Sequence, residues 1–115
     1  MLRKIISTGI ILLVTVAAQA VPHLSEAWLR AHYGKQEVYV PMRDGVRLHT
    51  AVYEPKDSLP HPVILLRTCY GLEPYGDKFP GSLRSWMRMF TLNGYIIVFQ
   101  SVRGTNLSEG TYENI

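Results

Sequence analysis

Few residues of this sequence are of types that do chemistry, and they do not form a complete catalytic set. The 115 residues contain no Gly-x-Ser-x-Gly nucleophile elbow, no His-x-x-x-His, no Cys-x-x-Cys and no glycine-rich phosphate loop. The single cysteine, Cys69, has no base near it in the sequence, so we expect a small buried hydrophobe rather than a thiol nucleophile. We expect the four histidines to be surface residues rather than ligands: His23, His32, His49 and His61. The sequence therefore indicates no metal or organic cofactor.

The elements that would position a site are two short apolar runs with loops after them. Residues 95–100 are almost wholly apolar, β-branched or aromatic, and residues 63–66 form a similar run. Such runs predict strands buried on both faces, as in a parallel α/β sheet. Residues 68–81, rich in Gly, Pro and Tyr, form a long loop after the first run, and loops of this length are usually functional or disordered. By its local sequence alone, Tyr70 in this loop is typical of a half-buried aromatic.

The N-terminal half of the sequence predicts a helix and a β-hairpin. Residues 24–33 predict a short helix, with Ser25 as its N-cap and Gly34 as its stop. Residues 37–43 predict a strand, and Pro41 places it at a sheet edge. Asp44-Gly45 is a strong signal for a two-residue hairpin, and residues 46–54 predict the returning strand. One face of that strand would carry alternating side chains: Val46, Leu48, Thr50 and Val52.

A second helix is predicted over residues 82–93, between the two apolar runs. Its apolar side chains recur at i, i+3, i+4 and i+7 and would form one face: Leu83, Trp86, Met87 and Phe90. Ser82 is the expected N-cap and Gly94 the expected stop. A hairpin followed by a strand, a helix and a strand predicts an α/β fold with a mixed sheet and a crossover helix.

The first twenty residues predict export. Arg3 and Lys4 precede an apolar run over residues 5–18, and Ala18-Gln19-Ala20 fits a signal-peptidase site, so residues 1–20 are expected to be a signal peptide. A membrane anchor is the alternative, but the run is shorter than the ~20 residues of a span. Cleavage near Ala20 would leave a periplasmic or extracellular protein with 10 Lys and Arg against 9 Asp and Glu, without a stable membrane anchor. This balance, with no basic cluster, argues against a nucleic-acid partner.

Three sequence patterns, in this order and spacing, carry a resemblance to a known family. The first runs from Pro41 through Asp44-Gly45-Val46-Arg47-Leu48 to Tyr53-Glu54-Pro55, and the second is the ten residues 62–71 that end in Arg67-Thr68-Cys69-Tyr70-Gly71. The third joins Asn93-Gly94-Tyr95, Val102-Arg103-Gly104 and Ser108-Glu109-Gly110-Thr111-Tyr112. Over residues 37–112 the sequence resembles the N-terminal part of the CocE/NonD hydrolases, a family of esterases and acylases to which the X-prolyl dipeptidyl peptidases are related.

The resemblance implies an α/β-hydrolase fold and Ser-His-Asp acyl transfer on a small ester, amide or peptide substrate. It implies that Tyr70 donates its hydroxyl to the oxyanion hole. The serine, aspartate and histidine would lie beyond residue 115, so residues 37–115 are expected to be an incomplete catalytic domain, preceded by residues 21–36. The full-length enzyme could form a homo-oligomer.

Two positions depart from the family pattern. The family usually has Pro where Cys69 lies, which could loosen the approach to Tyr70. It often has Asp where Ser101 lies, so a carboxylate partner for Arg103 could be missing. We expect Arg67 and Arg103 to be structural hydrogen-bonding residues rather than substrate ligands.

We therefore interpret the sequence as a fragment of an exported serine hydrolase, itself inactive. Two alternatives belong to other classes: a small exported binding module that uses the Tyr-rich loop, and a non-functional remnant.

Overall fold

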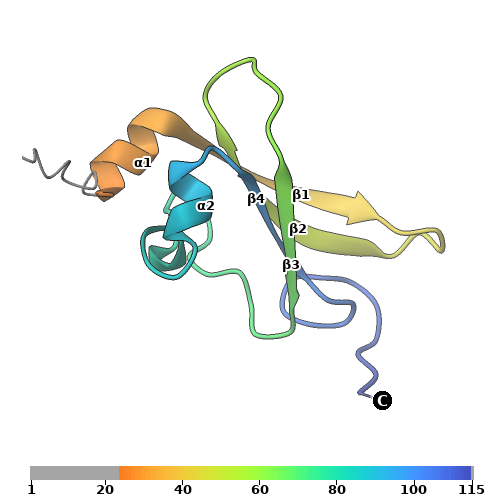
Figure 1. Ribbon diagram of the computed structural model, residues 1–115. Helices are drawn as coiled ribbons and strands as arrows, with labels where there is room; N and C mark the ends of the chain where they lie inside the picture. Colours follow the sequence, from red (N-terminus) through yellow and green to blue (C-terminus); the bar gives the residue numbers. More distant parts are fainter. Residues whose placement is uncertain (1–23, 115) are drawn as a thin grey trace, which may run out of the picture.

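One mixed sheet of four strands forms the frame of residues 24–114, which are the residues that this computed structural model describes. The predicted signal peptide, residues 1–20, lies outside them. The elements in chain order are α1 (Glu26–His32), β1 (Tyr33–Pro41), β2 (Arg47–Pro55), β3 (Val63–Thr68), the 3-10 helix η1 (Gly81–Arg84), α2 (Arg88–Leu92) and β4 (Ile96–Ser101) (Figure 1).

The strand order across the sheet is β1-β2-β4-β3. β1 and β2 form an antiparallel hairpin, β2 pairs antiparallel with β4, and β3 pairs parallel with β4. This confirms the predicted α/β class and the mixed sheet that begins with a hairpin. It also confirms that the strand containing Pro41 lies at a sheet edge, where the missing N–H of proline interrupts no inner ladder.

The first helix forms where the sequence predicts it. The Ser25 hydroxyl accepts the Trp28 N–H at 3.1 Å, and Glu26 pairs with Arg30 one turn later at 3.2 Å. The prediction that Gly34 stops this helix was wrong. The chain becomes extended at Tyr33, and Gly34 lies inside β1 opposite Glu54. The cause is long-range pairing, because β2 extends to Pro55 and offers partners to β1 from Tyr33 onward.

The turn of the hairpin has three residues, not the two predicted from Asp44-Gly45. Met42 N–H donates to the Val46 carbonyl at 2.8 Å, and Gly45 N–H donates to the Met42 carbonyl at 3.0 Å. Gly45 has a φ of +85°, which is the left-handed conformation that such a three-residue loop requires and that glycine adopts without strain.

The predicted single helix over 82–93 is broken into η1 and α2. Ser85 leaves helical geometry with φ −108° and ψ −107°, and Ser82 caps neither piece. The hydroxyl of Thr91 donates to the Leu83 carbonyl at 2.8 Å, which ties the two pieces together. The break buries Leu83 and Met87 fully but leaves Trp86 64% exposed, so the predicted apolar face is only partly buried.

Gly94 ends α2 as predicted. Its N–H donates to the Thr91 carbonyl, and Tyr95 N–H donates to the Phe90 carbonyl, which is the double bond pattern of a Schellman motif. The rings of Phe90 and Tyr95 pack edge-on with centroids 5.1 Å apart, and this contact fixes the turn into β4.

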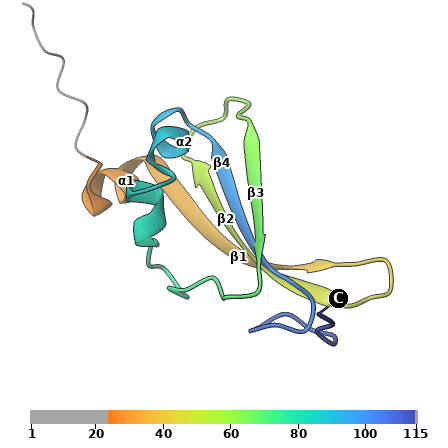
Figure 2. The ribbon, with the colours of Figure 1, turned by 60° about the horizontal axis from the view of Figure 1, so that its bottom comes forward.

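The core lies between one face of the sheet and the helices α1, η1 and α2, which gather on the same side (Figure 2). From β2 this face carries Ala51 and Tyr53, and the side chains predicted to share one face alternate with them and so lie on the other face. Leu48 and Thr50 of the predicted set are nevertheless buried on the other face.

The two apolar runs differ in burial. β4 lies between β2 and β3, so it is largely buried as predicted. β3 is the outer strand of the described sheet, and Val63 and Leu65 are 61% and 51% exposed. The prediction of a strand buried on both faces was therefore wrong for β3 within the described residues, because burial depends on neighbours that a local pattern does not specify.

Candidate active site

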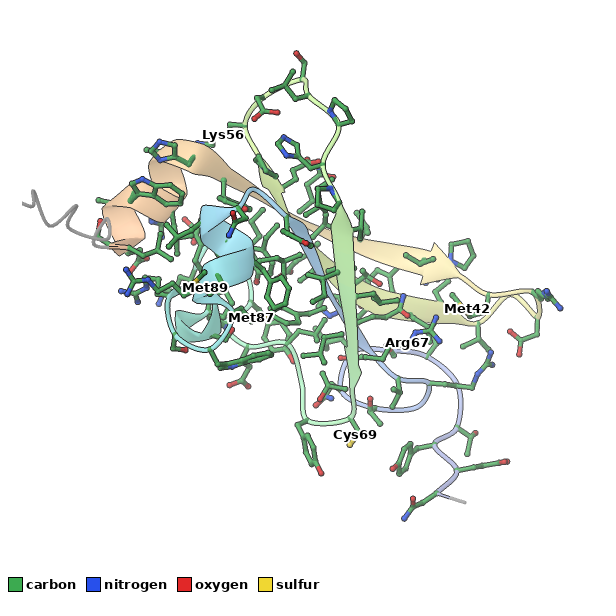
Figure 3. All side chains as sticks on the ribbon, in the orientation of Figure 1. Met42, Lys56, Arg67, Cys69, Met87 and Met89 are labelled. Atoms are coloured by element: carbon green, nitrogen blue, oxygen red, sulfur yellow. The ribbon has the colours of Figure 1, made fainter. Side chains whose placement is uncertain are left out.

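The carboxyl ends of the two parallel strands meet at one edge of the sheet. Thr68 ends β3 directly opposite Ser101, which ends β4, and Val102 N–H donates to the Thr68 carbonyl at 3.0 Å. The loops that follow both strands therefore begin side by side, and Figure 3 shows Cys69 at this edge, at the opposite end of β3 from Lys56. Such edges are where α/β sheets bind ligands.

A hollow of about 830 Å³ lies at this edge of the sheet. Residues 67–70, 102–103 and 110–113 line the hollow, together with Val46 from the hairpin. Its volume is in the range of small-molecule sites. This edge of the sheet thus offers an open, mixed polar and apolar surface to a ligand.

Tyr70 is the most exposed aromatic side chain of the hollow. It lies two residues beyond β3 and is 93% exposed, so its hydroxyl faces solvent rather than the core. The interpretation of Tyr70 as a half-buried loop aromatic was wrong. A phenol in this place can donate a hydrogen bond to a ligand without first breaking a contact inside the fold.

Cys69 lies beside Tyr70 in the hollow and is partly exposed. The expectation of a small buried hydrophobe was therefore wrong, because Cys69 follows a strand at the edge of the described sheet and is not covered on that side. The described residues contain no group of three or more His, Cys, Asp or Glu side chains that could hold a metal ion.

Two arginines at the hollow make side-chain hydrogen bonds within the fold, as predicted. Arg67 Nε donates to Gln100 Oε1 at 2.9 Å across β3 and β4. Arg103 donates to both carboxylate oxygens of Asp44, at 2.6 and 3.2 Å. These hydrogen bonds hold the pKa of Asp44 below its usual value. Asp44 is thus the carboxylate partner of Arg103, supplied by the hairpin and not by position 101.

A second ion pair joins the hairpin to the loop after β4. Glu109 Oε1 accepts from the Arg47 guanidinium at 2.7 and 2.9 Å, and Glu109 Oε2 accepts the Arg47 N–H at 2.9 Å. These hydrogen bonds hold the pKa of Glu109 below its usual value. Close packing explains the glycines before and after Glu109 in the chain. A Cβ on Gly104 would overlap the backbone of Tyr112, and a Cβ on Gly110 would lie 2.7 Å from Arg103 Cγ.

The serines near the hollow have structural roles. Ser101 is the last residue of β4 rather than a loop residue, and it is fully buried. Ser108 donates to the Ser101 carbonyl at 2.7 Å and accepts the His49 N–H at 2.9 Å. Neither serine occupies the sharp strand-to-helix turn that exposes a nucleophile.

The sequence did not reveal a buried polar cluster beneath the loop over 69–80. His49 is 3% exposed, so the prediction of a surface histidine was wrong; it packs between the rings of Tyr39 and Tyr75. Its Nε2 lies 3.8 Å from Glu37 Oε2, and its Nδ1 has no hydrogen-bond partner among the described residues. Its place on the same strand face as Ala51 and Tyr53 is the signal that could have found it.

Lys35 and Glu37 complete this cluster. Lys35 Nζ donates to the carbonyls of Pro74 and Lys78, both at 2.7 Å, and lies 3.4 Å from Glu37 Oε1. Burial, and secondly the Glu37 carboxylate, raise the pKa of Tyr53. The cluster anchors the loop whose first residues carry Tyr70.

No helix within residues 24–114 is long and apolar enough to span a membrane.

Comparison with known proteins places the chain in one group of hydrolases. The family described as X-Pro dipeptidyl-peptidase (S15 family) matches residues 44–115. Cocaine esterase of Rhodococcus sp. (strain MB1 Bresler) is 43% identical over 77 residues, which are 65% of this chain and 13% of that protein. An aminopeptidase from a marine-sediment Thaumarchaeota archaeon superposes with a TM-score of 0.57 at 35% identity, over 71% of this chain and 14% of its own. An α-amino acid ester hydrolase superposes with a TM-score of 0.56 at 34% sequence identity. The superposition covers 87% of this chain and 17% of the ester hydrolase.

Proposed function

The chain belongs to the X-Pro dipeptidyl-peptidase (S15) family, as the resemblance to the CocE/NonD hydrolases predicted, and from this we propose that it is the N-terminal part of a hydrolase that cleaves ester or peptide bonds. The chain spans 13% of the length of cocaine esterase and 14% and 17% of the two solved relatives. The proposal therefore concerns a whole protein of which these residues form a part.

In this proposal the protein acts by acyl transfer, and Tyr70 supplies one donor of the oxyanion hole. A serine Oγ attacks the substrate carbonyl carbon while a histidine takes the serine proton. The carbonyl oxygen becomes an oxyanion, to which the Tyr70 hydroxyl donates a hydrogen bond. The histidine then protonates the leaving alcohol or amine. In the second half of the reaction the histidine takes a proton from water, which attacks the acyl carbonyl carbon; the bond to serine Oγ breaks, the histidine returns a proton to the serine and the carboxylic acid leaves. An aspartate orients the histidine.

The nucleophile and its partners would come from outside this sequence. Its 115 residues contain no Gly-x-Ser-x-Gly, Ser101 is fully buried, and the Ser108 hydroxyl donates to the Ser101 carbonyl. The exposed apolar side chains of β3, Val63 and Leu65, also support the proposal that further chain belongs to the fold. An apolar strand at a sheet edge is normally covered by another segment of the protein.

The observation that carries the proposal is the position of Tyr70. Its side chain is 93% exposed, on a loop that is fixed to the sheet at the carboxyl ends of β3 and β4. Tyr70 is one of the residues that line a hollow of about 830 Å³, which has room for a substrate carbonyl.

The relatives' names cover esters and peptides, so the substrate class needs a direct measurement. The full-length protein should be assayed with p-nitrophenyl esters, α-amino acid esters and X-Pro p-nitroanilides. A fluorophosphonate probe should label it at one serine if the acyl-transfer mechanism is correct.

The key variant is Tyr70→Phe, which removes one hydroxyl and little volume. We expect kcat to fall by about 10²–10³, with a smaller change in KM, because the bond to the oxyanion forms mainly in the transition state. Tyr95→Phe is the matched control, because Tyr95 packs on Phe90 before β4 begins, at the strand end away from the hollow. Wild-type kcat in a folded Tyr70→Phe variant, or activity without fluorophosphonate labelling, would contradict the proposal.

A further inference from the structure

The backbone of Tyr70 fixes the direction in which its exposed side chain leaves the loop. Because the side chain is 93% exposed, few packing contacts restrain it. The direction of its Cα–Cβ bond follows from the peptide units on either side. The groups that hold those peptide units therefore determine the direction in which the side chain leaves the backbone, and rotation about χ1 and χ2 sets the position of the hydroxyl around that direction.

One of these peptide units is hydrogen-bonded at both ends by side chains. The Cys69 carbonyl and the Tyr70 N–H belong to the same planar unit. The Tyr70 N–H donates to Thr68 Oγ1 at 3.1 Å, and Asn106 Nδ2 donates to the Cys69 carbonyl at 3.2 Å. Thr68 ends β3, while Asn106 lies in the loop after β4. Two neighbouring segments of the sheet edge thus fix the plane of one peptide.

Asn106 has an unusual backbone conformation that fits this contact. Its φ is +50°, and it is the non-glycine residue with positive φ among those described. This conformation costs an ordinary residue about 1–2 kcal/mol, and asparagine is one of the few that tolerate it. Its side chain also lies beside Gly71, where a Cβ would be 3.4 Å from Asn106 Oδ1. The asparagine side chain is therefore hydrogen-bonded to the carbonyl before Tyr70 and lies next to the residue after it.

The loop that presents Asn106 is held by its own bonds. Thr105 N–H and Thr105 Oγ1 both donate to the Val102 carbonyl, at 3.1 and 2.7 Å, and Ser108 N–H donates to the Thr105 carbonyl at 2.9 Å. Ser108 in turn donates to the Ser101 carbonyl. The amide of Asn106 thus acts from a loop that is bonded to the end of β4.

We propose that Asn106 is a positioning residue that fixes the Cys69–Tyr70 peptide and so aims the Tyr70 hydroxyl at the reacting carbonyl oxygen, an inference that rests on the proposed role of Tyr70. Without the amide donor, the hydrogen bond to Thr68 Oγ1 is the remaining side-chain contact of this peptide. The plane of the peptide can then tilt about that hydrogen bond. The hydroxyl lies at the far end of a long rigid side chain, so a small rotation of the peptide displaces it substantially. Misplacement of a donor by about 1 Å can cost a factor of up to about 10² in rate.

Two substitutions remove the donor and keep the backbone conformation accessible. Asn106→Gly deletes the side chain and accepts positive φ, and Asn106→Asp keeps the shape but replaces the amide donor by an acceptor. Asn93→Ala is the matched control, since Asn93 Nδ2 makes a comparable bond to the Met89 carbonyl on α2, away from the hollow. Each variant should be made in the full-length protein, with kcat, KM and Tm measured.

We expect both Asn106 variants to lower kcat by about 10-fold, with KM and Tm close to wild type, and Asn93→Ala to leave kcat unchanged. In a Tyr70→Phe background, Asn106→Gly should lower kcat by less than about twofold further, because the hydroxyl that it aims is already absent.

Three results would overturn the inference. If Tyr70→Phe lowers kcat but neither Asn106 variant does, Asn106 has no positioning role and the proposed function is unaffected. If Asn106→Gly causes the same loss in both backgrounds, it acts elsewhere than through Tyr70. If Tyr70→Phe itself has wild-type kcat, the proposed function fails and this inference fails with it. Should Asn106→Gly not fold, Asn106→Asp decides the same questions.

Discussion

Replacing Lys35 with methionine should release the loop that begins with Tyr70. The side chain of Lys35 is only 5% exposed, and its ammonium donates to the Pro74 and Lys78 carbonyls at 2.7 Å each. It also lies 3.4 Å from Glu37 Oε1, and the same oxygen accepts the Gly76 N–H at 3.0 Å. Methionine fills a similar volume but makes none of these polar contacts.

The magnitude follows from the number and type of bonds lost. Each hydrogen bond from a charged donor contributes about 1.5–3 kcal/mol, so two amount to about 3–6 kcal/mol. Part is recovered, because methionine has no charge to desolvate and the loop carbonyls can bond to water once the loop opens. We therefore expect the free energy of opening this loop to fall by about 2–4 kcal/mol. Lys56→Met is the control: Lys56 is exposed, donates to the Arg30 carbonyl, and should change the same quantity by less than about 0.5 kcal/mol.

Native-state hydrogen exchange of the full-length protein measures this directly. The Gly76 N–H reports on the loop, because it donates to Glu37 in the closed form. A loss of 2–4 kcal/mol corresponds to exchange faster by about 30- to 1,000-fold. Gly76 exchange within about threefold of wild type in Lys35→Met would refute the view that this buried lysine anchors the loop.

Two further predictions concern the hairpin and the segment after β4. The Arg103 hydrogen bonds hold the pKa of Asp44 low, so their stabilising effect is complete above the usual aspartate pKa of about 3.9 and is lost as the pH falls through the lower folded value. An NMR titration of the Asp44 carboxyl should show this depression, and its persistence in Arg103→Met would mean that the guanidinium does not cause it. Gly104→Ala should destabilise the protein by at least about 2 kcal/mol more than Gly45→Ala in urea unfolding, since both positions have positive φ but only the Cβ at Gly104 would overlap backbone, that of Tyr112. Equal losses in the two variants would disprove the overlap.

The sequence determined the elements whose signals lie within a few residues. The Ser25 cap, the Gly94 stop and the edge strand marked by Pro41 form as predicted, because caps, turns and proline act through neighbouring backbone groups. The residues of the hydrolase family pattern also placed Tyr70 in a loop after a strand, and the structure has it there.

The tertiary structure decided what depends on distant partners. β1 begins at Tyr33 because β2 pairs with it there, and His49 is buried because Tyr39 and Tyr75 enclose it. β3 is exposed because it is the outer strand of the described sheet, although its apolar run resembles that of the inner strand β4. Local sequence records what a residue prefers, not which segment will cover it.

The candidate site shows the same division. Tyr70 could be chosen from the sequence, whereas its bonding through Thr68 and Asn106 could not, because Asn106 lies 37 positions from Cys69 in the chain. Parallel pairing of β3 and β4 brings these loops together, and only that pairing gives the Cys69–Tyr70 peptide two fixed ends. The sequence thus determined the chemical group of the site, the Tyr70 phenol. The sheet determined the orientation of the backbone that carries this phenol, because that orientation depends on hydrogen bonds between segments that are far apart in the chain.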